Sequence, residues 1–105
     1  MEPRISIVTL GTADIARACT FWEAMGLQRK AKSTPGMAFF QLNGLVLGLY
    51  PFDKLAKDCH LPGSPPAGAV TIAYNARNEA DVDEILAQAV AAGATLHVPA
   101  HKAFW

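Results

Sequence analysis

The sequence has few charged residues and few cysteines, and each shortage excludes a class of protein. Charged residues make up 17% of the 105 residues and balance to a formal net charge of zero. No cluster of lysine and arginine occurs, so neither a nucleic acid nor an anionic membrane surface is the expected partner. The two cysteines, Cys19 and Cys59, are too few for a disulfide framework, and we expect a reduced, cytoplasmic protein.

Long apolar runs and phosphate-binding loops are also missing. The apolar stretches are shorter than the ~20 residues that a helix needs to cross a bilayer, and the opening MEPRISIVTL lacks the apolar run of a signal peptide. The glycines are scattered and form no loop that would cradle a phosphate. With 51% apolar residues, the chain has the composition of a globular protein, and its length predicts one domain.

The chain opens with the pattern of a strand followed by an amphipathic helix. Residues 4–10 are rich in β-branched residues and predict a strand, after which Thr12 or Asp14 can cap a helix. Gly26 stands where a helix commonly ends with a left-handed residue. The apolar residues of this helix recur at helical spacing and predict its inward stripe, which comprises Ile15, Ala18, Cys19, Trp22 and Met25.

Three further strands and a short helix are predicted next. Residues 27–33 predict a more polar strand. Two apolar runs, 37–42 and 45–50, flank Asn43-Gly44, which is the strongest short signal for a β-hairpin because both turn residues are expected to take positive φ. Residues 52–57 then predict a short helical segment.

After a linker rich in proline and glycine (59–68), the same order of elements begins again. Residues 69–76 predict a strand, Asn78 can cap a helix, Gly93 ends it, and 95–98 predict another strand. The inward stripe of this helix comprises Val82, Ile85, Leu86, Ala89 and Val90. Strand, helix, glycine and strand thus occur twice, which indicates two copies of one supersecondary unit.

This repeated order resembles the vicinal oxygen chelate superfamily, which includes glyoxalase I, extradiol dioxygenases and the fosfomycin- and bleomycin-resistance proteins. The resemblance rests on VTLGTADIARACTFWEAMGL, the Asn-Gly hairpin and AVTIAYNARNEADVDEILAQAVAAGATL. It implies an α+β fold of paired βαβββ modules, whose sheets curve into a cup with the helices outside and the ligand inside. On this resemblance, module one spans 1–58 and module two spans 69–105, and we expect module two to be incomplete, without its last two strands.

The resemblance also locates the positions at which family members hold a divalent metal ion. These positions carry Ile7, Tyr50 and Thr71, and the fourth lies beyond the last residue. Isoleucine has no donor atom, and threonine and neutral tyrosine are poor ligands for a divalent ion. We therefore expect neither a metal nor another cofactor.

No constellation of catalytic residues is predicted. His60 lies in the linker, and His97 and His101 flank a proline that favours an extended chain, so we expect all three on the surface. Cys19 belongs to the helix stripe and is expected to pack in the core. These residues favour a binding protein and leave open whether the protein is an enzyme.

Strand alternation predicts the side chains that line the cup. If Ile7 faces the ligand, Thr9 does too, and a two-residue turn pairs Gln41 with Val46 and Phe39 with Gly48, which we expect to leave space over the Phe39 ring. The predicted ligand-binding residues are Ile7, Thr9, Phe39, Gln41, Tyr50, Thr71 and Asn75. This mixture of apolar, aromatic and neutral polar groups suits a planar or aromatic uncharged molecule, although such residues also fill protein interiors and dimer interfaces.

Three functions remain open. The favoured one is metal-independent binding of a small apolar or aromatic molecule in the cup. The second is a metal-dependent lyase or dioxygenase of the same superfamily, whose metal ligands would lie in the missing segment or in a partner chain. The third is an interaction module: a chain without two of its strands exposes sheet edges, which favour a homodimer formed by strand or module exchange.

Overall fold

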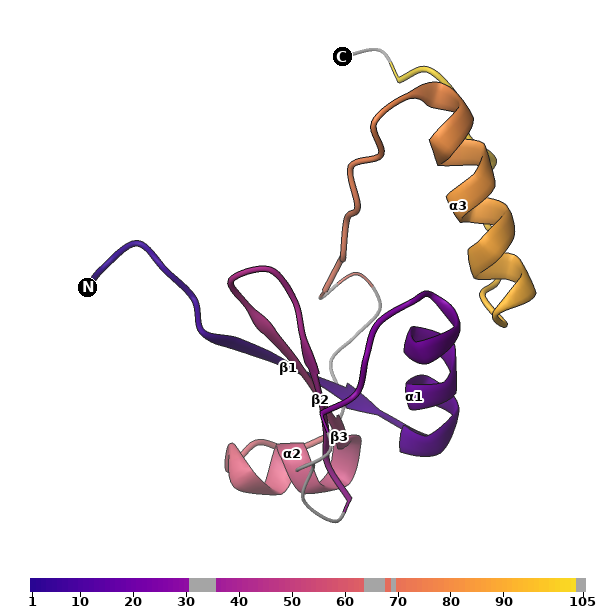
Figure 1. The fold of residues 1–105 in the computed structure, drawn as a ribbon. Helices are drawn as coiled ribbons and strands as arrows, with labels where there is room; N and C mark the ends of the chain where they lie inside the picture. Colours follow the sequence, from indigo (N-terminus) through magenta and orange to yellow (C-terminus); the bar gives the residue numbers. More distant parts are fainter. Residues whose placement is uncertain (31–35, 64–67, 69, 104–105) are drawn as a thin grey trace. The chain divides into compact units, whose positions relative to one another are not determined.

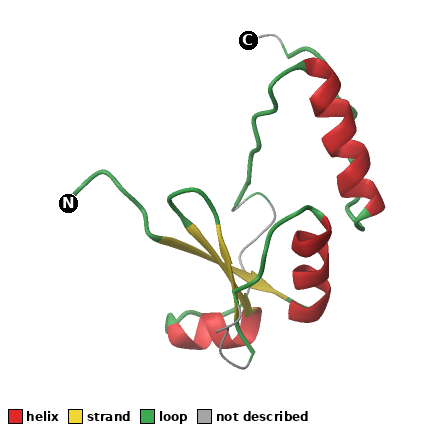
Figure 2. Ribbon diagram, in the orientation of Figure 1, coloured by secondary structure: helices red, strands yellow, loops and turns green. Residues whose placement is uncertain are grey.

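Three strands and three helices make up the computed structural model, which describes residues 1–30, 36–63, 68 and 70–103 (Figures 1 and 2). In chain order they are β1 (Ile7–Thr12), α1 (Ile15–Ala24), β2 (Ala38–Gln41), β3 (Val46–Pro51), α2 (Phe52–Asp58) and α3 (Glu79–Ala91). This confirms the predicted α+β class. The chain divides into two compact units, which we call unit 1 (Met1–Ala69) and unit 2 (Val70–Trp105). No helix among the described residues is long and apolar enough to cross a membrane.

Unit 1 contains a mixed sheet with the strand order β1-β3-β2 (Figure 1). The outer strand β1 runs parallel to β3, with Ile7 opposite Val46 and Thr12 opposite Pro51. Strand β2 runs antiparallel to β3, with Phe39 opposite Gly48 and Gln41 opposite Val46. The hairpin register predicted from the sequence is therefore confirmed.

The turn of this hairpin differs in one respect from the prediction. Leu42 N donates to Leu45 O at 2.8 Å and closes the turn. Gly44 takes a positive φ of 79°, but Asn43 keeps a negative one, so the expectation that both residues adopt positive φ is wrong. A turn in which only the second central residue needs positive φ still favours glycine at that place.

Helix α1 begins and ends with the residues that the sequence indicated. Of the two candidate caps, Asp14 is the one that acts: its Oδ1 accepts from Arg17 N at 3.0 Å. At the other end Gly26 has a φ of 97°, and Leu27 N donates to Trp22 O at 3.0 Å. Both interactions satisfy backbone groups that a helix end leaves without intrahelical partners.

The core of unit 1 lies between α1 and one face of the sheet. Its buried side chains are Cys19, Ala38, Phe40, Leu47 and Leu49. Four residues of the predicted stripe of α1 take part: Cys19 belongs to this cluster, and Ile15, Ala18 and Trp22 pack against it. The strand residues of the core alternate along β2 and β3, as expected when one face of a sheet is covered.

Helix α2 packs against the opposite face, at the end of the sheet where β1 finishes. A Cβ atom built on Gly11 would lie 2.5 Å from Cδ1 of Phe52 and 3.5 Å from Cδ2 of Leu55. Gly11 follows Ile7 and Thr9 at intervals of two, so its missing side chain would point away from the face that α1 covers. Helices therefore contact both faces of the sheet, α1 over the core and α2 at one end of the other face.

Three of the predicted strands do not form among the described residues. Within 27–30 the structure has one isolated bridge, between Arg29 and Phe40, and the remainder of the predicted strand (31–33) lies outside the described residues. Residues 70–76 and 95–98 contain no strand, so the strand predictions for 69–76, of which residue 69 is not described, and for 95–98 are wrong. A strand needs a neighbouring strand for its backbone hydrogen bonds, and the described part of unit 2 offers one helix and no strand.

Unit 2 consists of helix α3 and its flanking segments. Asn78 Oδ1 accepts from Asp81 N at 2.9 Å, as its predicted capping role requires, and Gly93 ends the helix with a φ of 109°. No described residue from 70 to 103 is buried, and Val82 and Val90 of the predicted stripe are 38% and 46% exposed. The apolar side chains of unit 2 thus lack a core of their own.

Candidate functional site

The face of the sheet opposite α1 gathers most of the residues that we predicted to bind a ligand. The strand register aligns Ile7 and Thr9 of β1 with Val46 and Gly48 of β3, and these with Gln41 and Phe39 of β2. Tyr50 follows Gly48 on the same face. We call this surface the open face; it comprises Ile7, Thr9, Phe39, Gln41, Val46, Gly48 and Tyr50. The structure thus brings five of the seven predicted site residues together, and their contact with a ligand stays a prediction.

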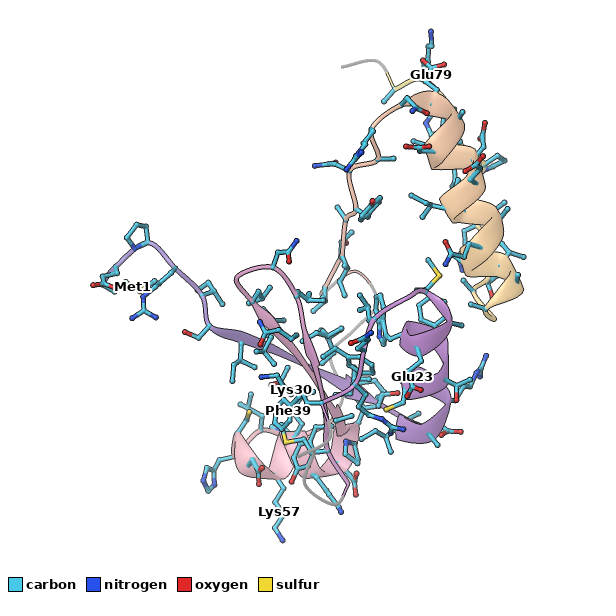
Figure 3. The ribbon with its side chains drawn as sticks, in the orientation of Figure 1. Met1, Glu23, Lys30, Phe39, Lys57 and Glu79 are labelled. Carbon is cyan, nitrogen blue, oxygen red and sulfur yellow. The ribbon has the colours of Figure 1, made fainter. Side chains whose placement is uncertain are left out.

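Thr9 and Phe39 meet over Gly48 at the centre of the open face (Phe39 is labelled in Figure 3). A Cβ atom on Gly48 would lie 2.9 Å from Oγ1 of Thr9 and 3.5 Å from Cε1 of Phe39. Gly48 is itself buried beneath these side chains. Thr9 and Phe39 thus lie close to the position that a side chain at residue 48 would occupy, and the expected space over the Phe39 ring stays a prediction. Glycine is needed here so that two outer strands can bring their side chains together over the middle one.

The open face is more exposed at the end near the hairpin than at its centre. Ile7 is 51% exposed and Gln41 is exposed, whereas Thr9, Phe39 and Tyr50 are half-buried. The amide nitrogen of Gln41 donates to the carbonyl oxygens of Leu42 at 2.8 Å and Leu45 at 3.3 Å. The side-chain donor of Gln41 therefore stabilises the hairpin, and its amide oxygen remains as the group that a ligand could contact.

Tyr50 lies beside the acidic residues of α2 at the other end of the open face. Partial burial raises the pKa of the Tyr50 phenol, and the carboxylate of Asp58 raises it further, both by its charge and as a hydrogen-bond acceptor. The negative charge of Asp53 acts in the same direction. Tyr50 consequently stays a neutral phenol well into the alkaline range and keeps its hydroxyl proton for hydrogen bonding.

The residues that the resemblance placed at metal positions are poor donors for a divalent ion. Ile7 offers no donor atom, and the raised pKa of Tyr50 works against the phenolate form that would bind a metal. Thr71, the third position, belongs to unit 2 and carries a neutral hydroxyl. Among the residues that the structure describes, no group of three or more histidine, cysteine, aspartate or glutamate side chains is arranged to hold a metal ion.

Two of the predicted site residues belong to unit 2. Thr71 and Asn75 are exposed in a segment of unit 2 that forms no strand. His60, His97 and His101 are exposed, as expected. Sequence analysis did not anticipate the approach of Asp53 and Asp58 to Tyr50. The one available signal was the predicted helix directly after Tyr50, which turns the chain back toward the strand end.

Solved structures of related proteins share this fold. A glyoxalase-related enzyme from Fulvimarina pelagi is 28% identical, with a TM-score of 0.76 over 87% of this chain and 66% of its own. A glyoxalase/bleomycin resistance protein/dioxygenase from Nocardioides is 21% identical, with a TM-score of 0.78 over 100% of this chain and 72% of its own. A glyoxalase/bleomycin resistance protein/dioxygenase family enzyme from Burkholderia phytofirmans PsJN is 19% identical, with a TM-score of 0.73 over 96% of this chain and 82% of its own. The chain thus spans slightly less than two thirds of the Fulvimarina protein.

The family assignment rests on nearly the whole sequence. No curated protein matches the chain. The family model of the Glyoxalase/Bleomycin resistance protein/Dioxygenase superfamily, however, matches residues 4–105. These residues include both segments on which the resemblance in the sequence was based, the opening of unit 1 and the opening of unit 2. The chain belongs to the Glyoxalase/Bleomycin resistance protein/Dioxygenase superfamily.

Proposed function

We propose that the open face binds a small apolar or aromatic molecule without a metal ion. The observation that carries the proposal is the placement of Ile7, Thr9, Phe39 and Tyr50 on one face that α1 leaves uncovered. Phe39 offers an aromatic surface for stacking, and the Tyr50 hydroxyl and the Gln41 amide oxygen offer hydrogen bonds at either end of the face. None of the open-face side chains carries a charge, which favours an uncharged ligand.

A titration followed by NMR tests this proposal with defined probes. We expect naphthalene and indole, added to the isotope-labelled chain, to shift the backbone amide signals of Thr9, Gly48 and Tyr50. Replacing Phe39→Ala removes the stacking surface and should weaken binding about fivefold, since an aromatic pair contributes about 1 kcal/mol beyond its buried area. Tyr74→Ala is the matched control, because Tyr74 is an aromatic residue of unit 2 that is 73% exposed. Shifts confined to other residues, or equal affinity in the Phe39 variant, would contradict the proposal.

The same spectra separate this function from a metal-dependent lyase or dioxygenase. A bound Mn²⁺ ion broadens the signals of nuclei near it. Metal-independent binding predicts that Mn²⁺ leaves the signals of Thr9, Gly48 and Tyr50 unchanged at concentrations that saturate ordinary enzyme sites. Selective broadening of these three signals at equimolar Mn²⁺ would contradict the metal-independent proposal and favour a metal-dependent lyase or dioxygenase.

A further inference from the structure

Gln41 uses both amide hydrogens of its side chain within the hairpin. Its Nε2 atom donates to Leu42 O at 2.8 Å and to Leu45 O at 3.3 Å. The reverse orientation of the amide would place its oxygen against these two carbonyl oxygens, which would repel it, so the hydrogen bonds fix the orientation. A side-chain amide has two N–H donors, and both are engaged here. At the hairpin end of the open face, Gln41 therefore offers a ligand an acceptor rather than a donor.

Tyr50, at the other end of the open face, has its single donor engaged in the same way. Its hydroxyl donates to the carboxylate of Asp58, the last residue of α2. A hydrogen bond to a carboxylate is about twice as strong as one between neutral groups, so a neutral ligand that can only accept does not replace Asp58. The lone pairs of the phenol oxygen stay available, and a hydroxyl that donates to an ion becomes a better acceptor. This end of the open face therefore also offers an acceptor.

Two further polar side chains are compatible with this pattern. The hydroxyl of Thr9 can donate or accept, so it discriminates against neither kind of ligand. The negative charge of Asp53 acts on the Tyr50 phenol together with that of Asp58. Negative charge attracts the partly positive hydrogen of an N–H or O–H group and repels a lone pair. The end of the open face next to α2 therefore favours a ligand that donates.

We propose that the open face selects ligands that donate hydrogen bonds, namely uncharged aromatic molecules that carry an N–H or O–H group. This selectivity rests on the proposed function and adds to it the polarity of the ligand. Gln41 and Tyr50 each present an acceptor, because the hairpin and α2 hold their donors. A ligand with acceptors alone would leave its own lone pairs and those of the protein without partners, which is costly when both are removed from water.

Paired titrations with indole and benzofuran, followed by NMR, test this selectivity. The two probes share one two-ring shape and differ in a single group, which is a donating N–H in indole and an accepting oxygen in benzofuran. The double variant Tyr50→Phe, Gln41→Leu lacks both acceptors and corrects for the different hydrophobicity of the probes. We expect the ratio of the two affinities to favour indole about fivefold more in the parent than in this variant, as one neutral hydrogen bond gives. Unchanged signals of the core residues Phe40 and Leu49 show that the variant is folded.

A second variant tests the direction of the Tyr50 hydrogen bond through a gain of binding, which loss of folding cannot produce. Asp58→Ala keeps the Tyr50 phenol but releases its proton, so the hydroxyl can now donate to benzofuran. The affinity for benzofuran should rise about fivefold, while indole, to which the phenol oxygen still accepts, should bind as before. Asp53→Ala is the matched control, because Asp53 lies on the same helix and acts on Tyr50 through its charge alone. It should leave both affinities unchanged.

Three outcomes would overturn the selectivity. Equal affinity ratios in the parent and the double variant, with both probes shifting the signals of Thr9, Gly48 and Tyr50, would refute it and leave the proposed function intact. Absence of these shifts with either probe would contradict the proposed function and the selectivity together. A gain for benzofuran that is missing in Asp58→Ala, or equally large in Asp53→Ala, would show that the hydrogen bond to Asp58 does not set the preference.

Discussion

The ring of Phe52 in α2 lies directly over Gly11 of β1, where a Cβ atom would come within 2.5 Å of Cδ1 and 3.0 Å of Cε1. Real Cβ atoms do not approach an aromatic ring this closely, so a side chain at position 11 would push α2 away from the sheet. Gly11 thus permits the contact between α2 and β1, which in turn brings the acidic residues of α2 toward Tyr50.

Replacing Gly11→Ala should destabilise the protein by about 1–3 kcal/mol, as is usual when extra atoms are forced into a packed contact. Urea unfolding measures this change as a lower midpoint. The matching double variant carries Phe52→Leu as well. In the Gly11→Ala background, Phe52→Leu should restore part of the lost stability. In the parent protein, Phe52→Leu should lower the stability, because it only removes packing contacts. A Gly11→Ala protein as stable as the parent would contradict the close contact.

The cap of α1 gives a second prediction. Asp14 Oδ1 accepts from Arg17 N at 3.0 Å, and α1 covers the core through Cys19 and Trp22. Asp14→Ala should therefore lower the free energy of unfolding by about 1 kcal/mol, because it removes the acceptor for a backbone donor at the helix start. Asp14→Asn keeps an acceptor at the same place and should stay within a few tenths of the parent. Equal losses in both variants would indicate that the charge, not the cap, matters.

The end of α2 gives a third prediction. His60 has a φ of 56°, its N–H donates to Lys57 O at 3.1 Å, and Leu61 N donates to Ala56 O at 3.0 Å. Helices α1 and α3 end with the same left-handed residue, which is a glycine in each, Gly26 and Gly93. His60→Gly should raise stability by about 1 kcal/mol, since a left-handed conformation is costly for a residue with a Cβ atom. Lys57→Gly, inside the same helix, should lower stability by about 1 kcal/mol instead. A loss in both variants would contradict the left-handed cap.

Features set by neighbours in the sequence were predictable, because their physics is local. The Asp14 and Asn78 caps, the glycine helix ends and the register of Phe39 with Gly48 each depend on a few adjacent residues. The family followed from the order of such elements. The grouping of Ile7, Thr9 and Tyr50 on one face followed from strand alternation, which holds wherever strands form.

Features that depend on distant partners were not predictable in the same way. The segments 70–76 and 95–98 have strand composition, but a strand forms only where another strand accepts its hydrogen bonds, and composition does not reveal that partner. Oγ1 of Thr9 lies within 2.9 Å of the place where a Cβ atom of Gly48 would stand, although the two residues are 39 positions apart in the chain. The approach of Asp58 to Tyr50 depends on how α2 packs on Gly11, which no local pattern encodes.

Tyr50 gives the last prediction, which concerns pH. Its pKa in the folded protein is raised above 10.0, the ordinary value for a tyrosine, by burial, by Asp58 and by Asp53. The folded state therefore holds the phenol proton more tightly than the unfolded state. Above pH 10.0 the unfolded phenol ionises first, so the stability that Tyr50 contributes is present below pH 10.0 and is lost as the pH rises toward the folded pKa.

Absorbance of the phenolate measures this pKa directly. The chain has two tyrosines, so Tyr74→Phe leaves Tyr50 as the single phenol to titrate. In that background Asp58→Asn should move the titration to lower pH, because it removes the carboxylate that raises the Tyr50 pKa most. Burial still keeps the Tyr50 pKa above its ordinary value. Glu23→Gln removes a carboxylate on α1 that pairs with Arg29 at 3.2 Å, and it should leave the titration unchanged. If Asp58→Asn and Glu23→Gln shifted the curve equally, the effect would come from net charge alone. A shift specific to Asp58 would instead establish that α2 lies against the end of the open face in solution, since only that packing brings this carboxylate to Tyr50.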